Sequence, residues 1–341
     1  MKEAATGEPQ QETVPARPTA LLLGDGPTAL SALRSLTHSF RVCRVLRSDS
    51  TPELDPLRLF AEKMGVQISA AEGLDGLASA ISELKPDVVV ISSFRFVIPP
   101  PVLRLSRFIN VHYSLLPTYR GRANVNWAII NGESAVGITI HAVTPDLDDG
   151  NILFQEAIPI GLNDTATSLY ERLNSLQERE LAATVARAIA GEEGVPQKTG
   201  EATYGCSRIP GDGEIDWKQK SAQIDRLIRA LAPPFPGAFT YLNFKRLTIA
   251  RAVPLSTPKA YIGRVPGRVI GRSPSEGWID VLTGDSVLRI FEVADEGTAV
   301  PVPAATIIRS TRVTLGLSVS DLLGKISELE HRLAKLESGL H

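Results

Sequence analysis

The N-terminal half of the chain alternates short apolar runs with stretches of helical periodicity. Residues 19–23 form an apolar run, which is followed by a glycine turn and by leucines spaced three residues apart. This pattern predicts a strand, a tight turn and a helix. The same reasoning predicts strands at 41–46 and 88–91 and helices at 57–64 and 74–84. Because alternating strands and helices form parallel sheets with right-handed crossovers, we predict an α/β, Rossmann-like domain.

From about residue 205 the pattern changes to short alternating runs separated by proline and glycine. Five short strands are predicted, at 238–241, 247–252, 267–270, 278–282 and 287–293. Such a series is typical of a small β-barrel of the oligonucleotide-binding (OB-like) type. Residues 205–320 hold 15 Lys+Arg and 10 Asp+Glu, a mild positive bias that fits either RNA or a solvated surface.

The two ends of the chain differ from both domains. Residues 1–18 are too polar to bury an apolar core, so they are expected to form a disordered tail. Residues 318–341 begin with a capping-box pattern and continue with apolar residues at 322, 326, 329, 333 and 336, a heptad spacing. This predicts an amphipathic helix that either docks on its own chain or forms a homodimer. The predicted domains therefore span residues 19–204 and 205–317.

Composition narrows the choice of function. The chain has 36 Lys+Arg and 38 Asp+Glu, a net charge of −2, so no strong electrostatic attraction to nucleic acid or membrane is expected. Cys43 and Cys206 are far apart and form no metal-binding motif, so we expect neither a disulfide framework nor a metal. No apolar run approaches the length of a membrane span, and no signal-peptide pattern is present. The sequence predicts a cytoplasmic protein without a membrane partner.

One strand carries the residue pair best suited to catalysis. Asn110 and His112 alternate within an apolar run, so their side chains project from the same face. An amide donor beside an imidazole suits acyl transfer, because one stabilises an oxyanion while the other accepts a proton. Acids that could assist the imidazole occur at 146, 148 and 149, after a strand predicted at 137–141 that ends in His141. A satisfied structural pair is the alternative interpretation.

The residues around this pair resemble a known family. In order, they read Asn110-x-His112-x-Ser114-Leu-Leu-Pro117, Tyr119-Arg-Gly121, Trp127 to Glu133, Gly137 to His141 and Leu147-Asp-Asp-Gly150. This combination resembles the 10-formyltetrahydrofolate-dependent formyltransferases. The family includes phosphoribosylglycinamide formyltransferase, methionyl-tRNA formyltransferase and the amino-sugar N-formyltransferases. The resemblance covers about residues 19–315 and includes the C-terminal domain of the longer members.

The resemblance implies an enzyme that transfers a formyl group from 10-formyltetrahydrofolate to a primary amine, without a metal. It implies a catalytic set of Asn110, His112 and Asp148, with a second acid, Asp149, where the family more often has a small residue. By the same analogy the folate would be held largely by main-chain groups. The implied folate-binding residues are Phe96, Val97, Ile98, Arg122, Thr144, Pro145, Asp146 and Leu147.

The acceptor amine is less closely defined. Methionyl-tRNA formyltransferases typically carry a basic insertion where this chain has the mildly acidic residues 47–55, which makes tRNA the less favoured partner. Residues 94–98 and 121–127 most resemble the domain that formylates UDP-4-amino-4-deoxy-L-arabinose, which favours a nucleotide-linked amino sugar. Asn124 and Asn126 could read such a substrate or could cap a helix. Methionyl-tRNA and hydroxyornithine or peptide amines remain alternatives, as do a non-catalytic RNA-binding module and a degenerate dimeric scaffold.

Overall fold

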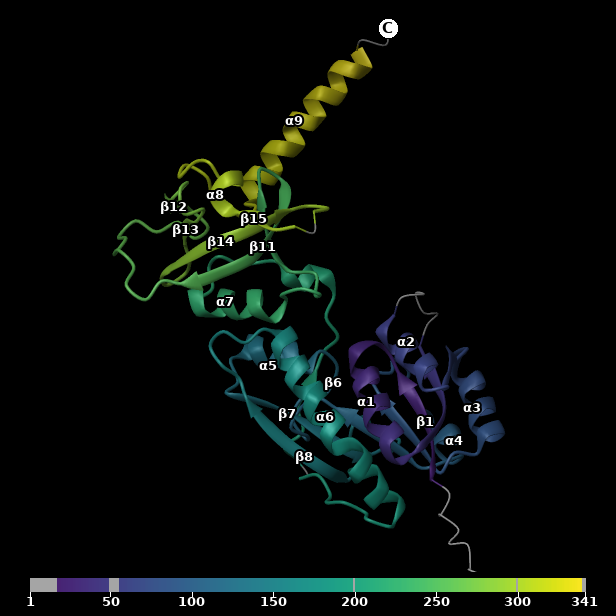
Figure 1. The fold of residues 1–341 in the computed structure, drawn as a ribbon. Helices are drawn as coiled ribbons and strands as arrows, with labels where there is room; N and C mark the ends of the chain where they lie inside the picture. Colours follow the sequence, from purple (N-terminus) through teal and green to yellow (C-terminus); the bar gives the residue numbers. More distant parts are fainter. Residues whose placement is uncertain (1–16, 49–54, 199, 299, 339–341) are drawn as a thin grey trace, which may run out of the picture. The chain divides into compact units, whose positions relative to one another are not determined.

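A computed structural model describes residues 17–48, 55–198, 200–298 and 300–338 (Figure 1). The chain divides into two compact units that interleave along the sequence. The first unit comprises the described residues of Met1–His112, Ile138–Gln155 and Asn174–Lys198, and the second comprises those of Tyr113–Gly137, Glu156–Leu173 and Thr199–His341. The domain boundaries expected near 204 and 317 stay predictions. The expected tail lies outside the described residues, except for residues 17 and 18.

A seven-stranded sheet carries the predicted α/β domain. Its strand order is β3-β2-β1-β4-β5-β7-β8. The strands are β1 (Thr19–Gly24), β2 (Arg41–Arg47), β3 (Gln67–Ala70), β4 (Val88–Ser92), β5 (Phe108–His112), β7 (Ala135–Ala142) and β8 (Ile152–Pro159). Neighbouring strands from β3 to β5 pair in parallel, whereas β5 and β7 pair antiparallel. The predicted parallel sheet is confirmed from β3 to β5. The next strand, β7, runs antiparallel to β5, which carries Asn110 and His112.

Helices connect the parallel strands, and the periodicity predicted three of them: α1 (Gly26–Ser39), α2 (Pro56–Lys63) and α3 (Gly73–Leu84). The short α4 (Pro100–Leu103) precedes β5 and the long α6 (Ala166–Ile189) follows β8; neither was predicted from the sequence. In α1, Leu33 and Leu36 are fully buried, so the predicted apolar stripe is the packed face. Helix α2 begins where Asp55 accepts a hydrogen bond from Leu57 N–H at 2.8 Å, an N-cap that sequence alone identifies poorly. Strand β4 is buried at every position, as expected for a central parallel strand.

The C-terminal part contains the second predicted sheet. Its antiparallel order is β10-β11-β14-β13-β12, with β15 paired to β14. The strands are β10 (Ala238–Leu242), β11 (Lys245–Pro254), β12 (Val269–Arg272), β13 (Ile279–Leu282), β14 (Val287–Asp295) and β15 (Val302–Pro303). All five predicted strands are present, and closure of the sheet into a barrel stays a prediction. Two short strands, β6 (Arg120–Gly121) and β9 (Tyr204–Gly205), pair separately.

The core of this sheet is closed by helix α7 (Ser221–Ala230). Ile224 and Ile228 of α7 pack in one buried cluster with residues of β11, β13 and β14. Trp217 joins the cluster, and its indole N–H donates to Thr240 Oγ1 at 2.9 Å, which satisfies the buried donor. The same compact unit also holds α5 (Asn124–Asn131), a 3₁₀ turn η1 (Pro210–Gly213) and α8 (Ala304–Ile307).

The C-terminal heptad segment forms helix α9 (Val319–Ser338), drawn in yellow in Figure 1. Ser318 N–H donates to Asp321 Oδ2 at 2.9 Å, and Asp321 N–H donates to Ser318 Oγ at 3.1 Å. This reciprocal pair is the predicted capping box. Residues 339–341 lie outside the described chain. Among the described residues, no helix is both long and apolar enough to cross a bilayer.

Candidate active site

Asn110 and His112 lie at the end of strand β5, two residues apart. Side chains alternate along a strand, so both project from one face of the sheet. The antiparallel register with β7 sets His141 opposite Asn110 and Thr139 opposite His112. The amide and imidazole predicted from the sequence are therefore neighbours, and β7 adds a second imidazole beside them.

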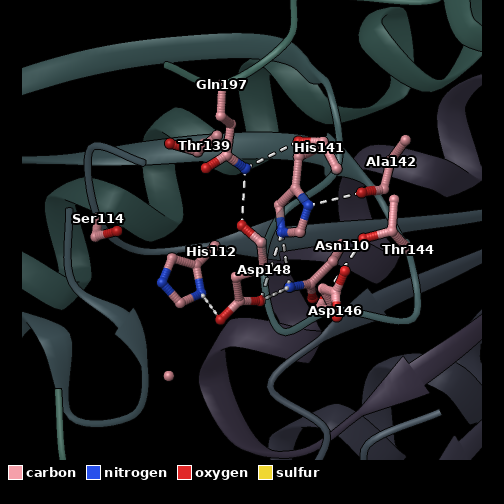
Figure 2. A network of polar contacts seen from close by, with 12 residues as sticks. Asn110, His112, Ser114, Thr139, His141, Ala142, Thr144, Asp146, Asp148 and Gln197 are labelled. Atoms are coloured by element: carbon pink, nitrogen blue, oxygen red, sulfur yellow. Dashed lines mark hydrogen bonds and ion pairs between the residues drawn. The ribbon is translucent and has the colours of Figure 1, made fainter. Parts of the chain in front are cut away.

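Asp148 connects these side chains (Figure 2). One of its carboxylate oxygens lies 3.3 Å from Asn110 Nδ2 and 3.6 Å from His141 Nε2. The other oxygen lies 3.6 Å from His112 Nδ1. The carboxylate thus faces one amide and two imidazoles, and its side chain is only 10% exposed. In such a partly desolvated place each of these contacts is stronger than it would be in water.

The backbone of the loop after β7 is held in the shape that aims Asp148 at the strands. Asp148 has a φ of 50°, in the left-handed region that Asp and Asn adopt more readily than most residues. Gln197 Nε2 donates to the carbonyl oxygens of Asp148 at 2.7 Å and of Gly150 at 2.9 Å. A Cβ on Gly150 would lie 1.8 Å from Ala142 O, so only glycine allows this close approach.

His141 is held in one tautomer by its two contacts. Its Nδ1 lies 2.8 Å from Ala142 O, and a carbonyl oxygen can only accept, so Nδ1 carries the hydrogen. In the neutral ring Nε2 then has a lone pair, and it lies 3.1 Å from Asn110 Nδ2, which donates to it. Because Asp148 also accepts from that nitrogen, the orientation of the Asn110 amide is fixed by two acceptors.

The structure distinguishes the two adjacent acids. Asp148 lies in the polar network, whereas Asp149 is exposed. His112 points Nδ1 at the carboxylate, so its other nitrogen, Nε2, faces away from Asp148 (Figure 2). Ser114 is not arranged as a nucleophile, because its hydroxyl donates to Thr118 O at 2.7 Å. The arrangement therefore suits general acid–base and oxyanion chemistry rather than a covalent intermediate.

Seven of the eight residues expected to bind folate lie in the first compact unit. Phe96, Val97 and Ile98 follow β4, and Thr144 to Leu147 form the loop before Asp148. Ile98 is buried in one cluster with the partly buried Val143, which connects the two segments. The side chains of Val97 and Leu147 are 66% and 45% exposed, so apolar surface lies on both segments. Arg122, the eighth, belongs to the second unit.

The second unit contains a cavity of about 450 Å³. Its wall combines two arginines, two aromatic rings and main chain from the η1 turn. The lining residues are Arg122, Ala123, Asn126, Tyr170, Ser207, Arg208, Ile209, Pro210, Gly213, Leu231, Phe235, Pro236 and Gly237. A cavity of this size, mostly apolar with a few charged groups, is typical of small-molecule sites.

Contacts around this cavity set the positions of its polar groups. The Arg208 guanidinium lies 4.7 Å from the Trp127 ring centroid and donates to Asp212 O at 2.7 Å. Burial lowers the pKa of Arg208, against the opposing effect of Asp212. Burial also raises the pKa of the Tyr170 phenol to about 12, and the ring of Tyr170 packs 6.0 Å from that of Phe235. Tyr170 therefore stays a neutral hydroxyl at physiological pH.

Sequence reasoning assigned some residues less well. Asn126 was expected to read substrate or to cap a helix; it lies inside α5 and does not cap that helix, its amide donates to Ala230 O at 2.6 Å, and its role as a substrate reader stays a prediction. Asn124 likewise donates to Gly121 O, at 3.4 Å, and Ala123 is the N-cap of α5 without a capping side chain. Gln197 was not anticipated at all, because a single glutamine outside any motif carries no local signal.

Over the described part of the chain, no three His, Cys, Asp or Glu side chains are grouped so that they could hold a metal ion. The polar network around Asp148 is built from two imidazoles, an amide and one carboxylate.

Comparisons with known proteins agree with this chemistry. The family model described as formyl transferase matches residues 45–185, and the model of the formyl transferase C-terminal domain matches residues 209–311. A methionyl-tRNA formyltransferase from Caldanaerobacter subterraneus subsp. tengcongensis is 35% identical over 250 residues, which cover 71% of this chain and 78% of the relative.

Solved structures share the fold at lower identity. An N-formyltransferase from Helicobacter canadensis, in complex with folinic acid and dTDP-3-aminofucose, superposes with a TM-score of 0.61 at 21% identity and covers 80% of this chain and 97% of its own. HypX from Aquifex aeolicus, in complex with tetrahydrofolic acid, superposes with a TM-score of 0.60 at 19% identity over 86% of this chain. The chain spans about half the length of HypX, 47%.

Proposed function

The chain belongs to the formyltransferase family, and from this premise we propose that Asn110, His112 and Asp148 transfer the formyl group to the primary amine of a nucleotide-linked amino sugar. The family consists of N-formyltransferases whose one-carbon donor is 10-formyltetrahydrofolate. The observation that carries the proposal for the catalytic set is the Asp148 carboxylate, which contacts both Asn110 and His112 in one buried network. With the two cysteines far apart in the sequence, the proposed compartment is the reducing cytoplasm.

In the proposed mechanism a neutral amine attacks the formyl carbon on N10 of the folate. The new N–C bond moves the carbonyl electrons onto oxygen, and collapse of the tetrahedral intermediate breaks the C–N10 bond. The amine loses one proton and N10 gains one, so protons balance. Holding both reactants in line supplies much of the rate. The protein groups then need to stabilise the oxyanion and to move the proton.

The three side chains divide these tasks. His112 presents Nε2 away from Asp148, so this nitrogen is proposed to accept the amine proton first and, once protonated, to donate a hydrogen bond to the oxyanion. Asp148 holds Nδ1 of His112, stabilises the imidazolium and relays the proton through water. Asn110 gives one amide N–H to the oxyanion in place of its 3.3 Å contact with Asp148. Catalytic hydrogen bonds commonly shorten only when the substrate is bound.

The proposed folate site is formed by the segments before Asp148 and after β4. Phe96, Val97, Ile98 and residues 144–147 offer main-chain donors and acceptors beside apolar surface, which suits a flat heterocycle with alternating donors and acceptors. The expected contact of Arg122 with folate stays a prediction, because Arg122 belongs to the second unit. Removing the apolar surface with Val97→Ser should raise the KM for the folate more than it lowers kcat.

The cavity of the second unit supports the choice of acceptor. Arg122 and Arg208 offer planar guanidinium groups, which bind phosphate oxygens in pairs. Phe235 and Tyr170 offer ring surface for a sugar or base, and the volume of about 450 Å³ fits a small molecule. The Helicobacter canadensis enzyme of the same fold was solved with a nucleotide-linked amino sugar. We therefore propose that this cavity binds the diphosphate of the nucleotide-linked amino sugar.

Methionyl-tRNA is the second candidate, and the 35% identity to a methionyl-tRNA formyltransferase favours it. Residues 49–54, where a basic insertion would lie, are outside the described chain. The variant Arg208→Ala tests the amino-sugar candidate. Arg208→Ala should raise the KM for a nucleotide-linked amino sugar about tenfold or more, because a partly buried cation is lost from the proposed phosphate site.

The test is formyl transfer from 10-formyltetrahydrofolate to a panel of amines, followed by mass spectrometry. The panel contains UDP- and dTDP-linked amino sugars, methionyl-tRNA and hydroxyornithine. We expect a mass increase of one formyl group on a nucleotide-linked amino sugar, and a smaller yield with Arg208→Ala. Formylation of methionyl-tRNA alone would reject the acceptor proposal and leave the catalytic set in place.

A further inference from the structure

Helix α9 carries an exposed apolar seam over its whole length. None of its residues is buried. The seam consists of Val319, Leu322, Ile326, Leu329, Leu333 and Leu336, which are between 44% and 73% exposed. Single exposed apolar residues are ordinary, but six on one face of a helix indicate an interaction surface. The helix lies beyond residue 311, where the match to the formyl transferase C-terminal domain ends, so the seam is not part of that domain.

The spacing of the seam is that of a coiled coil. The six residues follow one another at intervals of three and four, so they occupy the a and d positions of three consecutive heptads. Val319, Ile326 and Leu333 are a residues, and three leucines occupy d. β-Branched residues at a combined with leucine at d favour two strands over three or four. The residue types therefore indicate one partner helix.

The charges beside the seam select the orientation of that partner. Lys325 and Arg332 occupy g positions, and Glu330 and Glu337 occupy e positions. In a parallel, in-register pair each g residue faces the e residue five positions further along the partner helix. Both pairs then join a cation to a glutamate. In an antiparallel pair g would face g and e would face e, which brings like charges together.

We propose that α9 pairs with α9 of a second copy of this chain in a parallel, in-register, two-stranded coiled coil. Within one chain Lys325 and Arg332 both contact Glu328, at 2.7 Å and 3.8 Å. These pairs are exposed and contribute little stability, so the two cations can turn to the partner at small cost. Three heptads are short, and the dimer is therefore expected to depend on concentration.

The first test is sedimentation equilibrium of the full chain over two decades of concentration. We expect the mass to rise from that of one 36.7 kDa chain toward that of two. The variant Ile326→Glu with Leu333→Glu places charge in the seam and should stay monomeric. The matched control, Ser327→Glu with Ala334→Glu, adds the same charge one position away and should behave as the natural chain does. Helix content by circular dichroism shows that both variants fold.

A second test fixes the orientation. In a parallel, in-register pair, two chains with Leu322→Cys bring their new thiols together and form a disulfide-linked dimer on oxidation. In an antiparallel pair, Leu322 would face Leu333, so a link would form only in a mixture of Leu322→Cys and Leu333→Cys chains. The natural chain, with Cys43 and Cys206, is the control for unrelated links.

Three results would overturn the proposal. A chain that stays monomeric at all concentrations would show that the seam has another partner or docks on its own chain. A dimer that survives the Ile326→Glu, Leu333→Glu variant would place the interface elsewhere. A link found only in the mixed sample would reverse the orientation. None of these results bears on the proposed acceptor, because formyl transfer is measured separately.

Discussion

At the scale of single residues, the account rests on Asp148. Its carboxylate contacts Asn110 on β5 and His141 on β7 with one oxygen and His112 with the other. Asn110 Nδ2 and His112 Nδ1 can donate to it, and a largely buried carboxylate is stable only when its oxygens have such donors. Replacing any one of them changes the hydrogen bonds of the others, so the four side chains should act as a unit rather than as independent contributors.

Asn110→Ala and His112→Ala are each expected to lower kcat by roughly 10²-fold or more, because each removes an oxyanion or proton partner. Steady-state formyl transfer measures the loss, and circular dichroism should show an unchanged fold. His38→Ala, at an exposed position near the end of α1, is the matched control and should keep full activity. Near-normal turnover of both site variants would remove them from the mechanism.

His141 is expected to act as a positioning residue. Its Nε2 fixes the Asn110 amide at 3.1 Å, so His141→Leu leaves that amide without one acceptor. Misplacing a catalytic group slightly should lower kcat about tenfold while KM for the folate stays close to normal. His141→Gln, whose amide oxygen can accept the same hydrogen bond, should recover part of kcat. Equal losses in both variants would show a merely structural role.

At the scale of elements, the apolar runs predicted β1, β2 and β4 and the five strands of the C-terminal sheet, because local periodicity determines them. Local periodicity could not predict that β5 pairs with β7. Two strands separated by α5 can pair in several registers, and only the folded sheet sets His141 opposite Asn110. Gln197 is a similar case, since it meets the Asp148 loop from a distant part of the sequence. The sequence named Asn110, His112 and Asp148, which the structure brings together, but it could not predict the hydrogen bonds that join them to His141 and Gln197.

The loop between β7 and β8 should tolerate no side chain at Gly150. In Gly150→Ala the new methyl group would lie 1.8 Å from Ala142 O, so the loop must move and Asp148 with it. We expect a loss of about 1–3 kcal/mol in the free energy of unfolding and a fall in kcat. Urea denaturation measures the first effect and steady-state kinetics the second. As a control, Gly263→Ala changes a glycine with no atom within 4 Å of the added carbon and should leave kcat and the free energy of unfolding unchanged.

Helix α6 should become less stable at high pH because of Tyr170. The folded-state pKa of its phenol is about 12, above the ordinary value of 10, so folding favours the protonated form. This stabilisation is complete below pH 10 and is lost as the pH rises toward 12, at about 1.4 kcal/mol per pH unit. The free energy of unfolding of the natural chain, relative to that of Tyr170→Phe, should therefore fall by about that amount per pH unit over this range. Parallel curves would contradict the burial of the phenol.

At the scale of the whole molecule, the chain combines two compact units, each with its own chemistry. The first holds the Asp148 network, and the second holds a cavity with two arginines. The net charge of −2 excluded little by itself. Together with a cavity lined by two arginines, this low net charge favours a small anionic acceptor. A protein that binds a long nucleic acid commonly needs an extended basic surface.

The sequence could not define the acceptor, for a physical reason. The residues that line the proposed acceptor cavity come from separate places in the chain, such as Arg122 before α5, Tyr170 in α6 and Phe235 after α7. In the sequence each of these residues resembles an ordinary surface or core residue, and only the folded cavity brings them together. The formyl donor was easier to identify, since its chemistry depends on a compact motif between residues 110 and 150.

The most direct test of the account is the rate of transfer of a ¹³C-labelled formyl group from 10-formyltetrahydrofolate to a nucleotide-linked amino sugar, followed by NMR in a single turnover. The natural chain should form the labelled formamide, and Asp148→Asn should do so roughly 10²-fold more slowly or worse. Asp149→Asn, the adjacent and exposed acid, should react at the natural rate. Equal rates for the natural chain and Asp148→Asn would remove the Asp148 carboxylate from the mechanism.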